Sequence, residues 1–182
     1  MPDAAALLLV FVVFPLWVLS GLADWACHRA TRIDATSGLK ENLAHWVLFA
    51  QAGVAVVAMA LLQVNAAVLL VVAAAFVLHE LTVWIELRYT VPRRQVRPFE
   101  QMVHSFQELM LLVTLLLLAV LAWDQAVALA GSGPQLPDLS LRWKAQPLPP
   151  ALLLAGAGAV LLFNVLPLAQ ETGACLRARR RG

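Results

Sequence analysis

Histidines and the carboxylates spaced near them are the residues of this chain best suited to chemistry. There are four histidines, each near one end of an apolar stretch: His28, His45, His79 and His104. Acids stand four positions before three of them, at Asp24, Glu41 and Glu100. A spacing of four in an α-helix leaves two side chains only about 40° apart around the axis, so each pair would share one helix face.

The third histidine has a different set of acids. Glu80 follows His79 directly and points about 100° away, whereas Glu86 is seven positions on and returns to nearly the same face. By position, His79 and Glu80 lie inside an apolar stretch. Ionisable groups at such depth usually face the interior of a helix bundle, where they find partners.

Imidazole and carboxylate groups from facing helices are suitable ligands for a transition metal, and zinc or iron would fit them. The candidate ligands are Asp24, His28, Glu41, His45, His79, Glu80, Glu86, Glu100 and His104. A bound metal would activate water or oxygen, which predicts an oxidoreductase or a hydrolase that acts on a lipid or a quinone. Haem held by two histidines fits less well, because the acids beside the histidines suit a hard cation better.

Two other kinds of protein fit the same residues. In a non-enzymatic membrane subunit or scaffold, the acids and histidines would form salt bridges at a partner interface with Arg29, Arg32, Arg88, Arg93, Arg94 and Arg97. A transporter or metal-handling channel is a third hypothesis, although the middles of the apolar stretches offer few polar residues.

The elements that position these residues are transmembrane helices. With 62% hydrophobic and 13% charged residues, the chain is far less charged than a soluble domain, which has about 25%. Apolar runs long enough to cross a bilayer occupy about 4–23, 43–62, 66–87, 105–129 and 150–169. We therefore expect an all-α integral membrane protein, one domain over 1–182, with five transmembrane helices and a four-helix antiparallel core.

The basic residues predict the orientation. Eleven of the 13 Lys and Arg residues lie in the first loop, the third loop and the carboxyl-terminal tail, and short cytoplasmic loops carry such an excess. The amino terminus is then outside, and the carboxyl terminus and all four histidines are at the cytoplasmic side. Arginine greatly outnumbers lysine, which suggests a GC-rich bacterial genome and the inner membrane. The basic tail would contact anionic lipid, and we expect no nucleic-acid binding.

Three stretches carry a resemblance to known sequences: GLADWACHR at 21–29, SGLKENLAH at 37–45 and PFEQMVHS at 98–105. Over about the first 125 residues, the chain resembles a group of uncharacterised proteobacterial multi-pass inner-membrane proteins. The resemblance implies a membrane location and adds weight to the acid and histidine positions. Some members carry a diguanylate cyclase label, but this sequence lacks the GGDEF-type motif of that enzyme.

Overall fold

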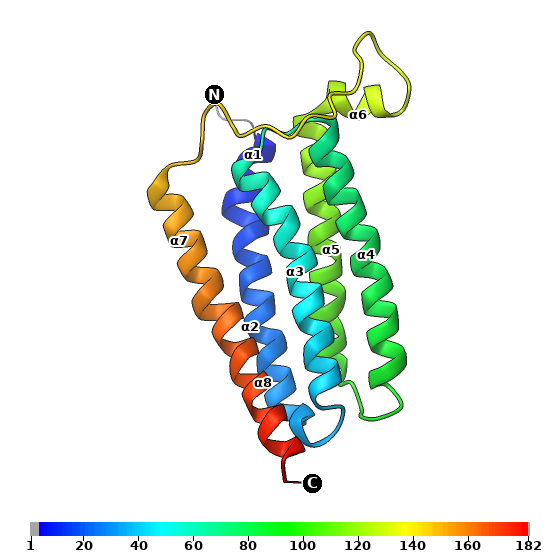
Figure 1. Cartoon of the computed structure of the whole chain (residues 1–182), viewed down its shortest axis with the longest axis vertical. Helices are drawn as coiled ribbons and strands as arrows, with labels where there is room; N and C mark the ends of the chain where they lie inside the picture. The colour runs from blue at the N-terminus through cyan, green and yellow to red at the C-terminus, as the bar shows by residue number, and fades with distance from the viewer. Residues whose placement is uncertain (1–3, 182) are drawn as a thin grey trace.

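The computed structural model describes residues 4–181 and is all-helical over them, with 79% helix and no strand (Figure 1). The elements are, in order, α1 (Ala4–Leu8), η1 (Leu9–Val13), α2 (Phe14–Thr31), η2 (Ile33–Ala35), α3 (Leu39–Leu61), α4 (Ala66–Thr90), α5 (Pro98–Leu121), α6 (Trp123–Leu129), α7 (Pro150–Val160), η3 (Leu161–Val165) and α8 (Leu166–Arg179). The elements α1, η1 and α2 form one continuous helix, and α7, η3 and α8 form another. With α3, α4 and α5 they give five helices long and apolar enough to cross a membrane, as the sequence predicts.

The helices start earlier or end later than the apolar runs that predict them. The first continues to Thr31, and the fourth starts at Pro98, where proline suits the first turn, instead of at 105. At its other end the fourth helix stops at Leu121, because Ala122 leaves the helical conformation before the short α6. The early starts and late ends place each acid and histidine pair within one continuous helix.

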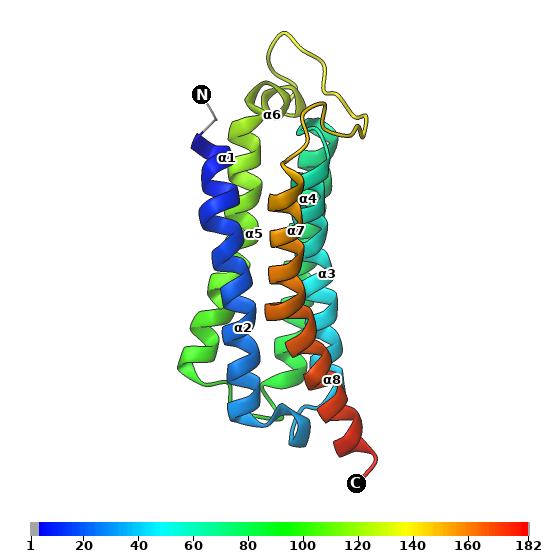
Figure 2. The same ribbon diagram turned by 90° about the vertical axis from the view of Figure 1, so that its left-hand side faces the viewer.

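The five helices run side by side in both views (Figures 1 and 2). Asn65 caps α4 by accepting a hydrogen bond from the Val68 N–H, and α3 and α4 pack together as a hairpin. Away from the histidines, the apolar core is built from residues of η1, α3, α4 and α5, among them Leu9, Val72 and Leu118. In Figure 1 α7 leans away from the bundle, and no α7 residue, all of which are described, is buried.

The first and last helices each contain a π-helical turn just before a proline. The turns η1 and η3 precede Pro15 and Pro167. Because proline has no N–H and its ring displaces the preceding turn, a wider turn accommodates it. In η3, the Asn164 Nδ2 donates a hydrogen bond to the Val18 carbonyl at 3.1 Å. A Cβ atom at Gly21 would come within 2.0 Å of that Nδ2, so the glycine allows the last helix to approach α2.

A loop over residues 131–149 closes one end of the bundle (Figure 1). Its backbone pairs with the turn between α3 and α4, since the Gln63 N–H donates to the Arg142 carbonyl at 2.9 Å. Asp138 accepts hydrogen bonds from the hydroxyl and the N–H of Ser140 and from the Arg142 guanidinium. These donors hold the pKa of the Asp138 carboxyl well below its usual range. Because it pairs with the turn between α3 and α4, this loop lies at the opposite end of the bundle from the ends that carry His28, His45 and His104.

Candidate metal centre

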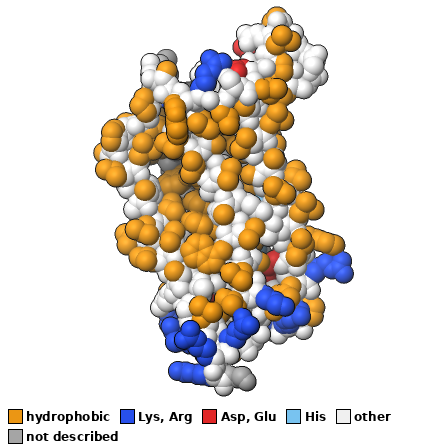
Figure 3. All heavy atoms as spheres, in the orientation of Figure 1, with side chains coloured by type: hydrophobic (Ala, Val, Ile, Leu, Met, Phe, Trp, Pro, Cys, Tyr) orange, Lys and Arg blue, Asp and Glu red, His pale blue; other side chains and the backbone are white. Residues whose placement is uncertain are grey.

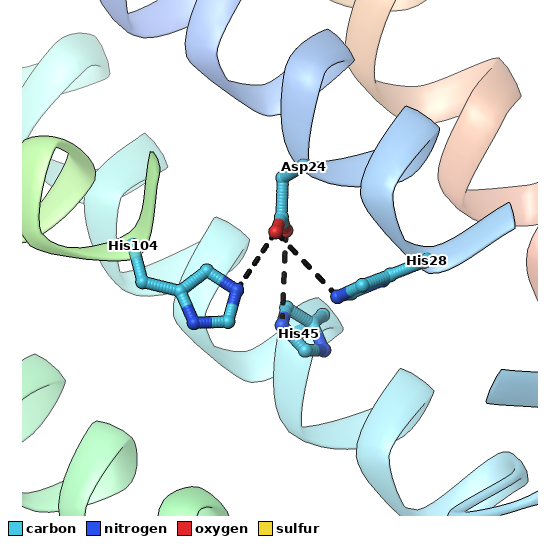
Figure 4. A group of neighbouring side chains, drawn as sticks. All are labelled: Asp24, His28, His45 and His104. Atoms are coloured by element: carbon cyan, nitrogen blue, oxygen red, sulfur yellow. Dashed lines mark hydrogen bonds and ion pairs between the residues drawn. The ribbon is translucent and has the colours of Figure 1, made fainter. Parts of the chain in front are cut away.

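Three histidines from three helices surround one carboxylate (Figure 4). Asp24 and His28 lie one turn apart on α2, His45 on α3 and His104 on α5. The Asp24 carboxylate is 2.8 Å from His104 Nε2, 3.5 Å from His28 Nε2 and 3.7 Å from His45 Nε2. All four residues are buried. We call Asp24, His28, His45 and His104 the ligand group.

The ligand group is nearly as tight as a coordination sphere. One donor atom from each residue lies within 4.8 Å of all the others. Because zinc binds imidazole nitrogen at about 2.0–2.1 Å, two ligands of one tetrahedral zinc ion lie about 3.4 Å apart. Small side-chain rotations would therefore bring three imidazole nitrogens and one carboxylate oxygen onto a single ion.

Hydrogen bonds at the far side of two rings set which nitrogen faces Asp24. The His28 Nδ1–H donates to Glu171 Oε2 at 3.0 Å, and the His45 Nδ1–H donates to the Glu41 carbonyl at 2.9 Å. An ionised carboxylate and a carbonyl have no proton to give, so Nδ1 carries the hydrogen, and in the neutral ring Nε2 keeps its lone pair. Metal-binding histidines are oriented in this way by a carboxylate or a carbonyl.

One nitrogen of the ligand group has no hydrogen-bond partner. His28 Nε2 is buried and makes no hydrogen bond to any described residue. The carboxylates of Asp24, Glu41 and Glu100 lie 3.5–3.8 Å away, which is too far for a hydrogen bond. A buried acceptor that faces only other acceptors needs a cation or a proton between them.

Glu41 and Glu100 form a second group with His28, but Arg94 already binds both of their carboxylates. Arg94, in the segment between α4 and α5, hydrogen-bonds to both carboxylates; its Nε is 3.1 Å from each Glu41 oxygen. Burial lowers the pKa of this guanidinium, but the two carboxylates more than offset that and raise the pKa above its usual range. Glu41, Glu100 and Arg94 are therefore satisfied as a salt-bridged unit, which we call the arginine bridge.

The other predicted ligands lie outside both groups. His79, on α4, is buried and lines the cavity next to the ligand group. Glu86 lines the same cavity, and one of its oxygens accepts a hydrogen bond from the Thr90 hydroxyl. Glu80 is half-buried and does not line that cavity. Of the nine residues predicted as ligands, the structure brings together six: Asp24, His28, Glu41, His45, Glu100 and His104.

Three of the six arginines of the predicted salt-bridge network contact aromatic rings. The guanidinium groups of Arg29, Arg88 and Arg93 lie over aromatic rings, at 3.8–5.2 Å from the ring centres. Among the described residues of that network, Arg94 makes the ion pairs with the acids. The predicted network is thus reduced to the arginine bridge.

A cavity of about 90 Å³ adjoins the ligand group. All four ligand residues line it, and Trp17, Phe49 and Ala52 form part of an apolar wall. The rings of Trp17 and Phe49 are stacked, with centroids 5.9 Å apart. A volume of this size holds several water molecules or a small organic group beside the ligands.

Sequence reasoning missed the residues that attach the last helix to the site. Glu171 on α8 uses both oxygens: Oε2 accepts from His28, and Oε1 accepts from Asn42 Nδ2 at 2.8 Å. The Thr172 hydroxyl donates to Asn42 Oδ1 at 2.7 Å and accepts from Trp46 Nε1 at 2.9 Å. Glu171 is the sole acid after residue 150, at the basic end of an apolar helix, and that position was the available signal.

Comparison with known protein families, with curated proteins and with solved structures found no match. The resemblance to proteobacterial inner-membrane proteins is neither supported nor opposed by that result. A functional argument therefore has to come from the geometry of the ligand group and its cavity.

Proposed function

We propose that this chain is a membrane-embedded metalloenzyme that binds one zinc or iron ion through Asp24, His28, His45 and His104. The observation that carries the proposal is the His28 ring. Its Nδ1 is fixed by Glu171, while its Nε2 is buried, unpartnered and directed at carboxylates. A divalent cation in the ligand group would satisfy that nitrogen and the Asp24 carboxylate together.

Charge also favours a cation. Five buried carboxylates, those of Asp24, Glu41, Glu86, Glu100 and Glu171, face one buried guanidinium, that of Arg94, within the described residues. Uncompensated charge in a membrane protein interior costs several kcal/mol per group, so the carboxyl groups would have to be opposed by a metal or by protonated histidines, or be protonated themselves. A protonated His28 Nε2 would form ion pairs with Asp24, Glu41 and Glu100 at 3.5–3.8 Å, so measurement of the metal content is what distinguishes a metal from a proton there.

The cavity supports a catalytic role for the metal. Structural zinc sites are closed by four protein ligands, whereas catalytic metals keep a position open to water or substrate. A catalytic ion held by all four members of the ligand group would therefore need a fifth coordination position on the side of the cavity. Every member of the ligand group lines the cavity, so a metal there would be reached from it. When bound, such a metal would supply Lewis-acid activation of water or of a substrate oxygen, which is the chemistry of a hydrolase or an oxidoreductase acting on a lipid or quinone.

The proposal includes the placement of the chain in the bacterial inner membrane, among lipids, with the amino terminus outside and the carboxyl terminus cytoplasmic. Figure 3 supports this orientation, since Lys and Arg side chains gather at the carboxyl-terminal end and hydrophobic side chains cover the middle. The histidines would then belong to a four-helix antiparallel core that faces the cytoplasm. The resemblance of the sequence to proteobacterial inner-membrane proteins belongs to the same proposal.

Elemental analysis of the detergent-purified protein tests the metal. We expect about one zinc or iron per chain, and at least a tenfold loss in a His45→Ala, His104→Ala double variant. His79→Ala is the matched control, because His79 is buried beside the cavity but outside the ligand group. No metal in a folded, monodisperse wild type would overturn the proposal.

That outcome would favour a non-enzymatic membrane subunit, for which the arginine bridge is the supporting observation. Arg94 joins the Glu41 of α3 to the Glu100 of α5 and needs no metal to do so. In such a protein the histidines would be protonated partners of the acids. Their replacement would lower stability without changing metal content.

A further inference from the structure

The charged groups that line the cavity are all acidic or histidine. Four carboxylates reach it: that of Asp24 in the ligand group, that of Glu171 bound to His28, and those of Glu86 and Glu108. Among the described residues, no Lys or Arg lines this cavity. A single divalent metal would leave the cavity with excess negative charge.

The cations of this end of the molecule lie elsewhere. Arg94 is bound to Glu41 and Glu100, and neither of these carboxylates lines the cavity. Arg29 and Arg88 lie over Trp25 and Trp84. Basic side chains outside the cavity could bind a phosphate headgroup, but none of the described ones lines the cavity.

The rest of the wall penalises ions of either sign. Trp17, Leu48, Phe49, Val83 and Leu168 present apolar side chains to the cavity. An ion that enters has to lose hydration against this wall, which is unfavourable without a charged partner. An anion would meet carboxylates, and a cation without a lone pair could not bind to a metal. An uncharged molecule with an electron-pair donor avoids both costs.

We propose that the cavity admits uncharged, apolar-bodied molecules with a nitrogen or oxygen donor to the metal, and excludes anions, including the phosphate of a phospholipid. This inference rests on the proposed function, because it concerns what reaches the metal. It narrows the substrate from lipids in general to neutral amphiphiles such as quinones, alcohols or neutral amines. The acidic wall, and above all Glu86 and Glu108, provides the selection.

Cobalt(II) in place of the native metal gives a direct readout, since its visible spectrum changes when a ligand binds. The purified full-length protein is loaded with cobalt and titrated with imidazole, which is neutral at about pH 8, and with azide, an anion of similar reach. We expect imidazole to bind at least tenfold more tightly than azide. Azide binding as tight as imidazole binding in the wild type would overturn the inference.

Charge variants separate selection by the wall from the preference of cobalt itself. Gln107→Arg places a cation at the cavity, and Glu108→Gln removes a negative charge with almost no change of shape. Each should tighten azide binding at least threefold and leave imidazole binding within twofold. Gln101→Arg, at an exposed site on the same helix, is the matched control and should change neither.

Failure of the two proposals can be told apart. If cobalt does not bind to the wild type, the metal centre itself is wrong. If cobalt binds but Gln107→Arg and Glu108→Gln leave azide affinity unchanged, the acidic wall does not select, and only the inference on the cavity fails.

Discussion

Replacement of Glu171 by Gln removes one negative charge and one acceptor from the metal centre without changing the shape of the side chain. In the wild type, the Glu171 carboxylate accepts hydrogen bonds from His28 Nδ1 at 3.0 Å and from Asn42 Nδ2 at 2.8 Å. A Gln side chain has one carbonyl oxygen, so it can satisfy one of these donors and turns its NH₂ group to the other. If the NH₂ group faces His28, Nδ1 has to accept, so the proton of the neutral ring moves to Nε2 and that nitrogen loses its lone pair for the metal.

Loss of such an orienting partner typically weakens metal binding about 10- to 100-fold, or about 1.4–2.7 kcal/mol. We expect this decrease in the zinc affinity of Glu171→Gln, measured by competition with a chromophoric chelator. Thr172→Val is the control, because Thr172 lies next to Glu171 on α8 and hydrogen-bonds to Asn42 and Trp46 but not to His28. Unchanged affinity in Glu171→Gln, or an equal loss in Thr172→Val, would refute the role of Glu171 in orienting His28.

Two further predictions concern what holds the site in place. Arg94→Ala leaves the buried carboxylates of Glu41 and Glu100 without a counter-ion, which should cost about 3–5 kcal/mol of unfolding free energy; a thermal or denaturant unfolding curve unchanged from wild type would contradict this. Gly21→Ala should cost about 1–3 kcal/mol, because its Cβ would overlap Asn164. A Gly21→Ala, Asn164→Ala double variant should recover part of that loss, and strictly additive losses in the same unfolding assay would show that the two residues do not compete for space.

The sequence predicted the membrane helices because hydrophobic length is a local property. Each run long enough for a bilayer became a helix, and the spacing of four brought two side chains together in the case of Asp24 and His28. The bounds were less predictable. Polar residues such as those around Asp24 and Glu100 look like loop in a hydropathy profile, yet they are helical because they face partners within the bundle.

What could not be predicted is which residues face one another across helices. His28, His45 and His104 lie near one end of their helices, whereas His79 lies in the middle of α4 and lines the cavity outside the ligand group. Glu171 entered the site because the Asn164 contact with Gly21 and the π-turn at η3 bring the last helix against α2. Such choices depend on close packing between distant segments, and no local pattern encodes them.

The arginine bridge and the ligand group lie in the same bundle, and the difference between them bears on whether the protein is an enzyme or a scaffold. The arginine bridge is complete, since its carboxylates are hydrogen-bonded and its charges are opposed. The ligand group has three imidazoles around one carboxylate, an unpartnered His28 Nε2 and a cavity at its side. A structural role is fulfilled by the first kind of group, whereas an incomplete polar group in an apolar bundle is costly to keep. A cation would make the second group as complete as the first, and the cavity would give that cation something to act on.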